Sequence, residues 1–384
     1  MLARLARLEH GKLTLIDGDE TFRFGQVSQN CDLSASIEIL DPRFWADVAL
    51  GGNTGAGESY MRGHWRPDDL TSVVRILVRN RDVLLKMDDG AGWISQPMYR
   101  LAHWLHRNNR DGSRRNIAAH YDLGNDFYAA MLDPRMTYTC GYWSEASTLE
   151  QAQNAKLDLI CRKLGLEPGM RVLDIGCGWG SFMSYAAEHY GVHCTGVTIS
   201  REQADWARKR YPELPLEFRF QDYREVEGSF DRIVSVGMFE HVGRKNHRVF
   251  MEVAHRCLAE DGLFLLHTIG KNLRNSVPDP WIDKYIFPKG DLPSIGQIGD
   301  AADELFVVED LHNFGADYDR TLMAWHANFE AAWPRFADQL GGRFYRMWRY
   351  YLLSCAGAFR ARDIQLWQWV LSRAGVAGGY RRIS

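Results

Sequence analysis

The chain has 384 residues, of which 46% are hydrophobic and 25% are charged, a balance that is ordinary for a globular protein. Its net charge of −3 provides no overall attraction to nucleic acid or to an anionic membrane, so no nucleic-acid partner is expected and any membrane contact must come from a local patch. Seven cysteines, an odd number, argue against a disulfide framework and favour a reducing, cytoplasmic location.

Residues 1–85 are predicted to form a small α+β domain that associates with lipid or membrane. The first twelve residues lack the apolar core of a signal peptide, and no apolar run reaches the roughly 20 residues that cross a bilayer. The predicted elements are short strands at 13–17, 21–24 and 36–40 and a helix at 70–83. Asp68 and Asp69 precede that helix, where a carboxylate stabilises the first turn. Glu58 and His64 form either an acid–base pair or, more in keeping with their surroundings, the polar edge of a packed turn.

Residues 86–118 are predicted to be a helical linker. Residues 93–105 carry apolar side chains at mixed helical spacing, whereas residues 107–115 are rich in Arg, Asn, Asp and Gly and are typical of an exposed connector. A contact between these arginines and a phospholipid headgroup is the alternative interpretation.

Strands and helices alternate between residues 119 and 384, which predicts an α/β fold with a parallel, doubly wound sheet. After a first strand at Val172, the others are predicted at 194–199, 216–220, 232–236, 263–269, 306–311 and 364–371, the last of them antiparallel. Two helices, at 319–340 and 342–360, precede the last strand. An insert at 270–300 breaks the alternation with four prolines and several aromatic residues. An insert of this length is more often a functional lid than a disordered segment.

The stretch Val172–Gly180 reads Val-Leu-Asp-Ile-Gly-Cys-Gly-Trp-Gly. It predicts a buried strand that ends in a glycine-rich turn and opens a helix, with a ligand outside the carboxyl end of the strand. The spacing differs from the dinucleotide fingerprint Gly-x-Gly-x-x-Gly, and no Lys-Ser/Thr pair follows as in a P-loop. The pattern resembles motif I of class I S-adenosylmethionine-dependent methyltransferases. Taken alone, it is equally compatible with an ordinary tight turn.

Further stretches make the pattern specific. They are Tyr121–Asn125, Thr139–Trp143, Gly196–Ser200, Gln221–Arg224, Gly237–Gly243 and, nearer the N-terminus, Gly57–Gly63. Together with the glycine loop they resemble the cyclopropane-fatty-acyl-phospholipid synthases, whose relatives modify mycolic acids, over essentially the whole length of the chain. The resemblance implies the class I methyltransferase fold, a Rossmann-like sheet of seven strands, with a smaller N-terminal α+β domain.

The activity that the resemblance implies is transfer of a methylene unit from S-adenosylmethionine to the cis double bond of an unsaturated phospholipid acyl chain, which forms a cyclopropane ring. Three alternatives stay open. The same alkene could gain a methyl branch without ring closure, the chain could be a small-molecule O- or N-methyltransferase with Glu240-His241 as its base, or it could be a lipid-binding carrier.

The resemblance also implies the residues that bind S-adenosylmethionine. They are Tyr121, Tyr138, Asp174, Gly176, Gly178, Thr198, Ser200, Gln203, Gln221 and Asp222. The glycines line the methionine end, and the two tyrosines close over the sulfonium. Gln203 takes the ribose contact in place of the usual acid, because an amide offers both a donor and an acceptor. Gln221 and Asp222 reach the adenine.

Ring closure requires a base, and the resemblance implies a bound bicarbonate ion in that role. The matching residues are Cys140, Glu240, His267, Ile269 and Tyr318. A small oxyanion needs donors, which a Tyr hydroxyl, an imidazole N–H, the Ile269 backbone N–H and a thiol offer. Glu240 must then either accept the O–H of the bicarbonate or orient His267. Read singly, each of the five is compatible with a structural role, and Cys140 also with a nucleophile.

No metal site is expected, since His241, His247 and His255 lack the i, i+4 spacing that would place ligands on one helix face. The substrate implies transient, peripheral contact with the inner face of the membrane. Residues 277–292 are the preferred candidate for the acyl-chain entrance, ahead of the Arg- and aromatic-rich stretch 342–350, whose aromatics are expected to pack inward. The sequence leaves assembly as a homodimer open.

Overall fold

The computed structural model describes residues 1–85, 123–274 and 278–383. They pack into two compact units. The first comprises the described parts of Met1–Arg107, Val277–Pro288 and Leu322–Asp363, and the second the described parts of Asn108–Ser276, Lys289–Thr321 and Ile364–Ser384. The helical linker predicted at 86–118 lies outside the described residues.

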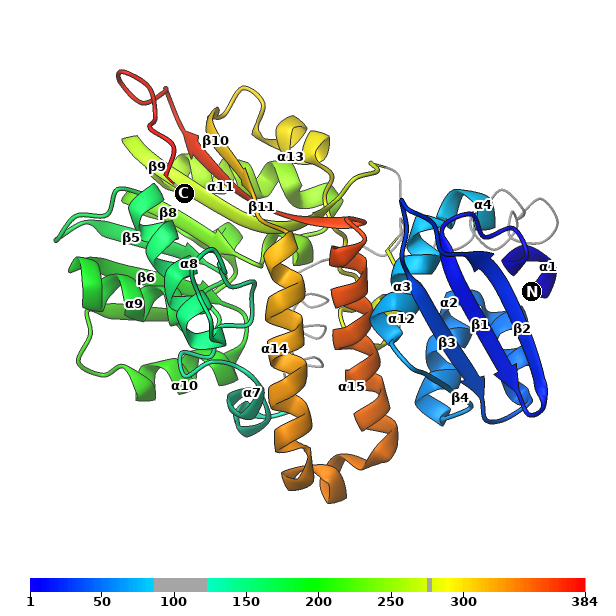
Figure 1. The fold of residues 1–384 in the computed structure, drawn as a ribbon. Helices are drawn as coiled ribbons and strands as arrows, with labels where there is room; N and C mark the ends of the chain where they lie inside the picture. The colour runs from blue at the N-terminus through cyan, green and yellow to red at the C-terminus, as the bar shows by residue number, and fades with distance from the viewer. Residues whose placement is uncertain (86–122, 275–277, 384) are drawn as a thin grey trace. The chain divides into compact units, whose positions relative to one another are not determined.

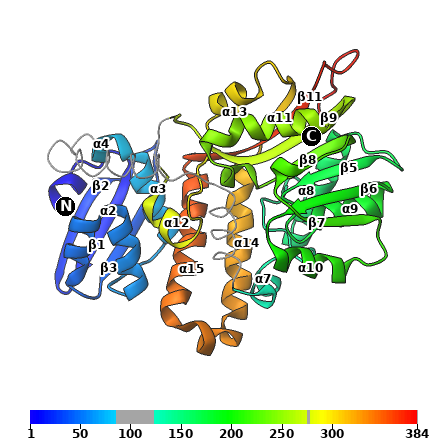
Figure 2. The same cartoon turned by 180° about the vertical axis from the view of Figure 1, so that it is seen from behind.

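The first unit contains a four-stranded sheet in the order β2-β1-β3-β4. Its strands are β1 (Gly11–Asp17), β2 (Glu20–Gln26), β3 (Ser34–Ile39) and β4 (Trp65–Pro67), and its N-terminal helices are α1 (Leu2–Leu5), α2 (Arg43–Arg62), α3 (Leu70–Arg79) and α4 (Arg81–Leu85). Figure 2 shows α2 and α3 against one face of this sheet. Asp69 caps α3 through the Thr71 backbone N–H at 2.9 Å, as predicted for a carboxylate at the helix start. Neither α2 nor β4 was predicted.

The first unit also includes α12 (Pro280–Tyr285), the end of α14 (Ala316–Ala332) and α15 (Ala337–Arg360). The predicted boundaries place these helices in the C-terminal domain, whereas the structure groups them with the N-terminal sheet. Trp281 of α12 is buried, and a Cβ on Gly57 would lie 2.5 Å from its ring. The regular part of α15 resumes after Gly341, whose φ of 72° interrupts the helix, so the predicted start at residue 342 is confirmed.

The second unit contains a seven-stranded sheet in the order β10-β11-β9-β8-β5-β6-β7 (Figure 1). The strands are β5 (Arg171–Ile175), β6 (His193–Thr198), β7 (Leu216–Phe220), β8 (Phe230–Val236), β9 (Leu258–Lys271), β10 (Val307–Asn313) and β11 (Ile364–Ser372). The pairs from β7 to β9 are parallel, and β11 is antiparallel to both its neighbours. The predicted doubly wound α/β sheet with an antiparallel last strand is therefore confirmed.

Both faces of this sheet are buried, as the apolar strands predict. Its helices are α7 (Asn125–Met131), α8 (Leu149–Lys163), α9 (Ser181–Tyr190), α10 (Arg201–Arg210), α11 (His247–Cys257), α13 (Ile295–Ala302) and the start of α14. Neighbouring residues of β5 point to opposite cores, Leu173 toward α11 and α13 and Val172 toward α8 and α9. The strand order reverses between β5 and β8, and ligands of open α/β sheets bind outside the carboxyl ends of the strands at such a switch point.

None of the helices in the described parts of the chain is both long and apolar enough to cross a membrane.

Candidate active site

The glycine loop follows β5 at the switch point of the sheet. Gly176, Gly178 and Gly180 have φ values of 92°, 54° and 80°, a left-handed conformation that glycine adopts without steric cost. A Cβ on Gly176 would lie 2.5 Å from the Met238 side chain, whereas no heavy atom lies within 4 Å of a Cβ on Gly178. The loop is thus tightly packed at its start and open beside Gly178, which suits the close approach of a ligand to the main chain.

Aromatic side chains from preceding segments pack against this loop. The Trp179 indole donates to Asn125 Oδ1 at 2.7 Å. Its ring lies 5.1 Å from that of Tyr128 in α7, which in turn lies 5.4 Å from the ring of Tyr138. Tyr138, predicted to close over the cofactor, is therefore linked to the glycine loop through edge-on and tilted ring contacts. The companion residue, Tyr121, lies outside the described residues.

The predicted ribose contacts lie at the carboxyl end of β6. The Thr198 hydroxyl accepts from the Ser200 backbone N–H at 3.1 Å, and the Ser200 hydroxyl accepts from the backbone N–H of Gln203 at 3.3 Å. Gln203 is buried in the first turn of α10. These bonds fix the turn, so the Gln203 amide is held at the edge of the sheet where the ligand is expected.

The predicted adenine contacts lie at the end of β7, and the Gln221 backbone N–H donates to the Thr198 carbonyl at 3.0 Å. Their side chains bind within the local turn. The Asp222 carboxylate accepts from the Arg224 guanidinium at 2.7 and 2.8 Å, and the Gln221 amide donates to the Glu225 carbonyl at 2.8 Å. The adenine contacts stay a prediction.

Asp174, the acid of the glycine motif, lies in β5 and is 3% exposed. Burial raises the pKa of this carboxyl from 3.8 to about 7, and the positive charge of Lys156 opposes the rise. The acid therefore lies beneath the loop, where its charge depends on its neighbours.

Glu240 lies in the 3-10 turn η2 (Phe239–His241) after β8 and is 5% exposed. Its Oε1 accepts from the Ile269 backbone N–H of β9 at 2.6 Å, whereas the buried Oε2 has no hydrogen-bond partner among the described residues. Burial raises the pKa of Glu240 from 4.5 to about 7, against the effect of the Ile269 N–H. The Ile269 N–H thus holds the glutamate in this structure, and its contact with bicarbonate stays a prediction.

His267 of β9 is 1% exposed and faces Gln368 of β11 across the antiparallel pair. Its Nδ1 lies 3.2 Å from the Gln368 amide nitrogen. With that nitrogen donating, Nδ1 is the acceptor and Nε2 carries the proton. The buried Nε2 has no partner within the described ranges, and burial lowers the pKa of His267 well below 6.5. The site thus contains a neutral imidazole with an unused donor.

Cys140 and Tyr318 come from two segments that Thr321 joins. The Thr321 hydroxyl in α14 accepts from the Gly141 backbone N–H at 3.0 Å and from the Trp143 indole at 2.8 Å, and it lies 3.9 Å from Cys140 Sγ. Tyr318 is buried one turn earlier on the same helix. Burial raises the pKa of Cys140 well above its usual range, which favours a neutral thiol and argues against a nucleophilic thiolate.

The segment carrying Cys140 also contacts the strand end that carries His267. Gly237, just after β8, donates its backbone N–H to the His267 carbonyl at 2.9 Å, and a Cβ on it would lie 2.6 Å from the Thr139 methyl. The structure therefore brings the five predicted base-site residues to adjoining segments at the carboxyl edge of β8 and β9.

Sequence reasoning missed the residues that hold these side chains. Among them are Thr321, Gln368, Asn125, Gln153 and Lys156. Asn125 lies within a stretch that the family pattern singled out. The others carry no local signal, because each contacts a segment far along the chain.

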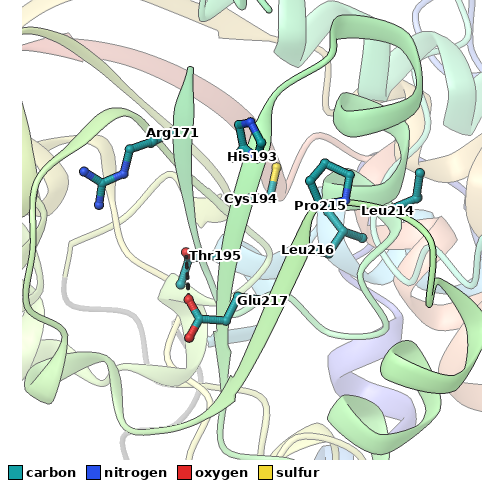
Figure 3. Close-up of a pocket in the computed structure, with 8 residues that line it drawn as sticks. All are labelled: Arg171, His193, Cys194, Thr195, Leu214, Pro215, Leu216 and Glu217. Atoms are coloured by element: carbon teal, nitrogen blue, oxygen red, sulfur yellow. Dashed lines mark hydrogen bonds between the residues drawn. The ribbon is translucent and has the colours of Figure 1, made fainter. Parts of the chain in front are cut away.

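The pocket in Figure 3 is a separate feature. It is lined by Arg171, His193, Cys194, Thr195, Leu214, Pro215, Leu216 and Glu217. These residues lie where β5, β6 and β7 begin, at the opposite end of the strands from the glycine loop. No group of three or more His, Cys, Asp or Glu residues in the described part of the chain could hold a metal ion.

Comparison with known proteins shows that the chain is similar to cyclopropane synthases. A family model described as mycolic acid cyclopropane synthetase matches residues 108–369. The chain is 50% identical over 357 residues to the cyclopropane-fatty-acyl-phospholipid synthase of Escherichia coli K12, covering 92% of each chain. It is 38% identical to cyclopropane mycolic acid synthase 3 of Mycobacterium tuberculosis, covering 67% of this chain and 96% of the relative. The structure of mycolic acid cyclopropane synthase CmaA1 complexed with SAH and CTAB matches with a TM-score of 0.63 at 35% identity, covering 67% of this chain and 97% of that one.

Proposed function

The chain belongs to the mycolic acid cyclopropane synthetase family, and we propose that it transfers a methylene unit from S-adenosylmethionine to the cis double bond of an unsaturated phospholipid acyl chain, forming a cyclopropane ring. One observation carries the proposal. A buried carboxylate oxygen of Glu240 and a buried imidazole nitrogen of His267 both lack partners among the described residues, at the edge of the sheet where the glycine loop opens. Buried polar groups are normally paired, so this pair points to a polar ligand.

The residues of the glycine loop suit the cofactor. S-adenosylmethionine, when bound, supplies an electrophilic methyl group. The open space beside Gly178 accommodates its methionine end, the Gln203 amide offers a donor and an acceptor to the ribose, and the ring of Tyr138 closes over the sulfonium. Packing of Tyr138 on Tyr128 and of Tyr128 on Trp179 limits access of water, which would otherwise trap a cation on the acyl chain.

The base site must remove one proton after the methyl group has reached the alkene. We propose that a bicarbonate ion, which would supply the proton acceptor, is held by Cys140, Glu240, His267, Ile269 and Tyr318. Glu240 Oε2 is an acceptor for its O–H and His267 Nε2 a donor to its oxygens. Since Oε1 of Glu240 is held by the Ile269 N–H, the free oxygen has a fixed position.

Unsaturated phospholipid vesicles provide the direct test. The purified protein is incubated with vesicles and S-adenosylmethionine in carbonate-free buffer and again with bicarbonate restored, and the acyl chains are analysed by mass spectrometry. We expect cyclopropane chains and a rate that rises when bicarbonate is added. Unchanged olefins together with methylation of a polar acceptor would contradict the proposed function, whereas ring formation that is indifferent to bicarbonate would contradict only the anion.

Methyl branching without ring closure is the second candidate, because the chain is 32% identical to a probable fatty acid methyltransferase of Pseudomonas putida, covering 93% of this chain and 90% of the relative. Both reactions begin with the same cation on the acyl chain. A donor deuterated at its methyl group separates them, since ring closure removes one donor deuterium and a methyl branch can keep all of them.

We further propose that the protein acts peripherally at the inner face of the cytoplasmic membrane, where its substrate lies, with residues 1–85 contributing to lipid association. Co-sedimentation with vesicles tests the contact, and analytical ultracentrifugation tests a homodimer.

A further inference from the structure

Lys156 is a buried charge that the reaction described above does not use. It lies in α8 and is 1% exposed. Its ammonium donates to the Thr139 hydroxyl at 2.8 Å. Burying an ammonium group costs several kcal/mol unless its surroundings compensate. Burial of this charge next to Thr139 is therefore expected to serve the site.

Two side chains on one face of α8 hold the same residue, Thr139. Gln153, one turn before Lys156, donates its amide to the Thr139 carbonyl at 2.8 Å. Lys156 binds the Thr139 hydroxyl, so residue 139 is fixed through both its backbone and its side chain. Its two neighbours in sequence are Tyr138, which packs toward the glycine loop, and Cys140 of the base site.

The charge of Lys156 reaches both halves of the site. It opposes the rise in the pKa of the buried Asp174 and Asp133 carboxyls and of the Cys140 thiol, and it helps burial to lower the pKa of His267, an effect to which Lys163 adds. Burial in turn lowers the pKa of Lys156 to about 8, against the negative charges of Asp133 and Asp174.

We propose that Lys156 is a positioning residue of the methyl-transfer site, whose ammonium, together with the Gln153 amide, fixes on α8 the segment that carries Tyr138 and Cys140. The inference rests on the proposed function for its kinetic consequence, but its effect on cofactor binding can be measured without turnover. A protonated Lys156 is the competent form, so the rate should fall on the alkaline side as this group loses its proton.

The test compares Lys156→Met with Lys163→Met. Lys163 is the matched control because it lies two turns further along the same helix, is also fully buried, and has a pKa lowered to about 8, but binds His312 and Asp310 of β10. Misplacement of groups around a reacting centre costs on the order of 100-fold in rate. We expect Lys156→Met to lose roughly that factor in kcat and to bind S-adenosylmethionine about tenfold more weakly by calorimetry, and Lys163→Met to retain most of both.

Lys156→Arg and Thr139→Val keep the inference testable if Lys156→Met does not fold. Arginine keeps its charge at all relevant pH values, so Lys156→Arg should recover part of the rate and move the alkaline fall, centred near pH 8 in the parent, to higher pH. Thr139→Val removes the acceptor and should lower the rate by about tenfold. The proposal would be overturned if the rate of Lys156→Arg fell at the same alkaline pH as the rate of the parent. It would also be overturned if Lys156→Met and Lys163→Met bound S-adenosylmethionine equally well. If the parent formed no cyclopropane but Lys156→Met still lost cofactor affinity, the proposed function would fail and the positioning role would stand.

Discussion

Two glutamates, one in each unit, differ both in burial and in surroundings: the Glu58 side chain is 17% exposed, whereas Glu240 is 5% exposed. Glu58 of α2 accepts from Lys284 and Tyr285 of α12 at 2.6 and 2.8 Å and from Arg62 at 3.0 Å, and the hydrogen bond from Lys284 is the main cause of its lowered pKa. Glu240 receives one backbone N–H on Oε1 and nothing from the described residues on Oε2. Deep burial raises the pKa of Glu240, whereas charged donors lower the pKa of Glu58. Burial and donors together therefore separate a glutamate that can hold a proton from one that fastens a helix.

Among the variants considered, Glu240→Gln should lower kcat the most, because it removes the carboxylate with the free oxygen. The amide keeps the shape of the side chain, and its oxygen can still accept from the Ile269 N–H. An uncharged NH2 group, however, takes the place of Oε2 and cannot accept a proton. We expect kcat to fall by about a thousandfold, within the range of general acid–base contributions, while calorimetric affinity for S-adenosylmethionine changes little. Comparable losses in affinity and in kcat would assign Glu240 to cofactor binding instead.

The pH dependence of stability should separate the two glutamates next. The pKa of Glu240 rises from 4.5 to about 7 on folding, so between these values the native state binds a proton that the unfolded chain has released. Stability from this group is therefore present below pH 4.5 and is lost as pH rises to about 7, by an amount on the order of 3 kcal/mol.

Urea unfolding in carbonate-free buffer at pH 5 and pH 7.5 measures this loss. Glu240→Gln should lose distinctly less stability between the two pH values than the parent. Asp174, whose pKa also rises to about 7, will retain part of the slope in both proteins. Parallel slopes in parent and variant would mean that Glu240 titrates normally.

Features that depend on neighbouring residues could be predicted from the sequence, whereas features that depend on distant partners could not. The turn after β5 is local, so the glycine pattern correctly placed Gly176 and Gly178 in a turn after a strand, and alternating apolar segments predicted the strands of the seven-stranded sheet. The acid–base alternative for Glu58 and His64 depended on distant partners. In the structure the His64 ring binds Asp47 at 2.8 Å, and Glu58 binds α12, more than 220 residues away in sequence. Likewise, the Ile269 N–H could be assigned to Glu240 only once β8 and β9 were paired. Helix α2 escaped prediction because its glycines, including Gly52 with φ 53°, obscure the helical pattern.

Gln368→Leu tests the donor of the site, His267, by removing the amide that contacts its Nδ1 atom. Without the Gln368 amide, the Nδ1 atom of His267 has no partner and its tautomer is no longer fixed. We expect kcat to fall on the order of tenfold, as is usual when a residue that orients a reactive side chain is removed, with cofactor affinity retained. Gln368→Glu, which can accept from Nδ1–H and so favours the other tautomer, should be worse than leucine. Equal rates for the two variants would show that the tautomer does not matter.

Glu58→Gln should have the smallest effect, and it tests whether a fully paired carboxylate has any part in the reaction. The amide oxygen still accepts from Tyr285, but the ion pairs with Lys284 and Arg62 are lost. Their side chains are 56% and 41% exposed, and exposed ion pairs contribute about 0–1 kcal/mol each. The free energy of unfolding should therefore fall by at most about 2 kcal/mol, and the rate on vesicles should stay within about twofold of the parent. Because the folded pKa of Glu58 is lowered, its contribution is present above pH 4.5 and lost as pH falls, which is opposite in sign to that of Glu240. A large loss of rate at unchanged stability would show that the contact between α12 and α2 is needed for turnover. Both glutamates would then contribute to the reaction, Glu240 next to the reacting atoms and Glu58 far from them.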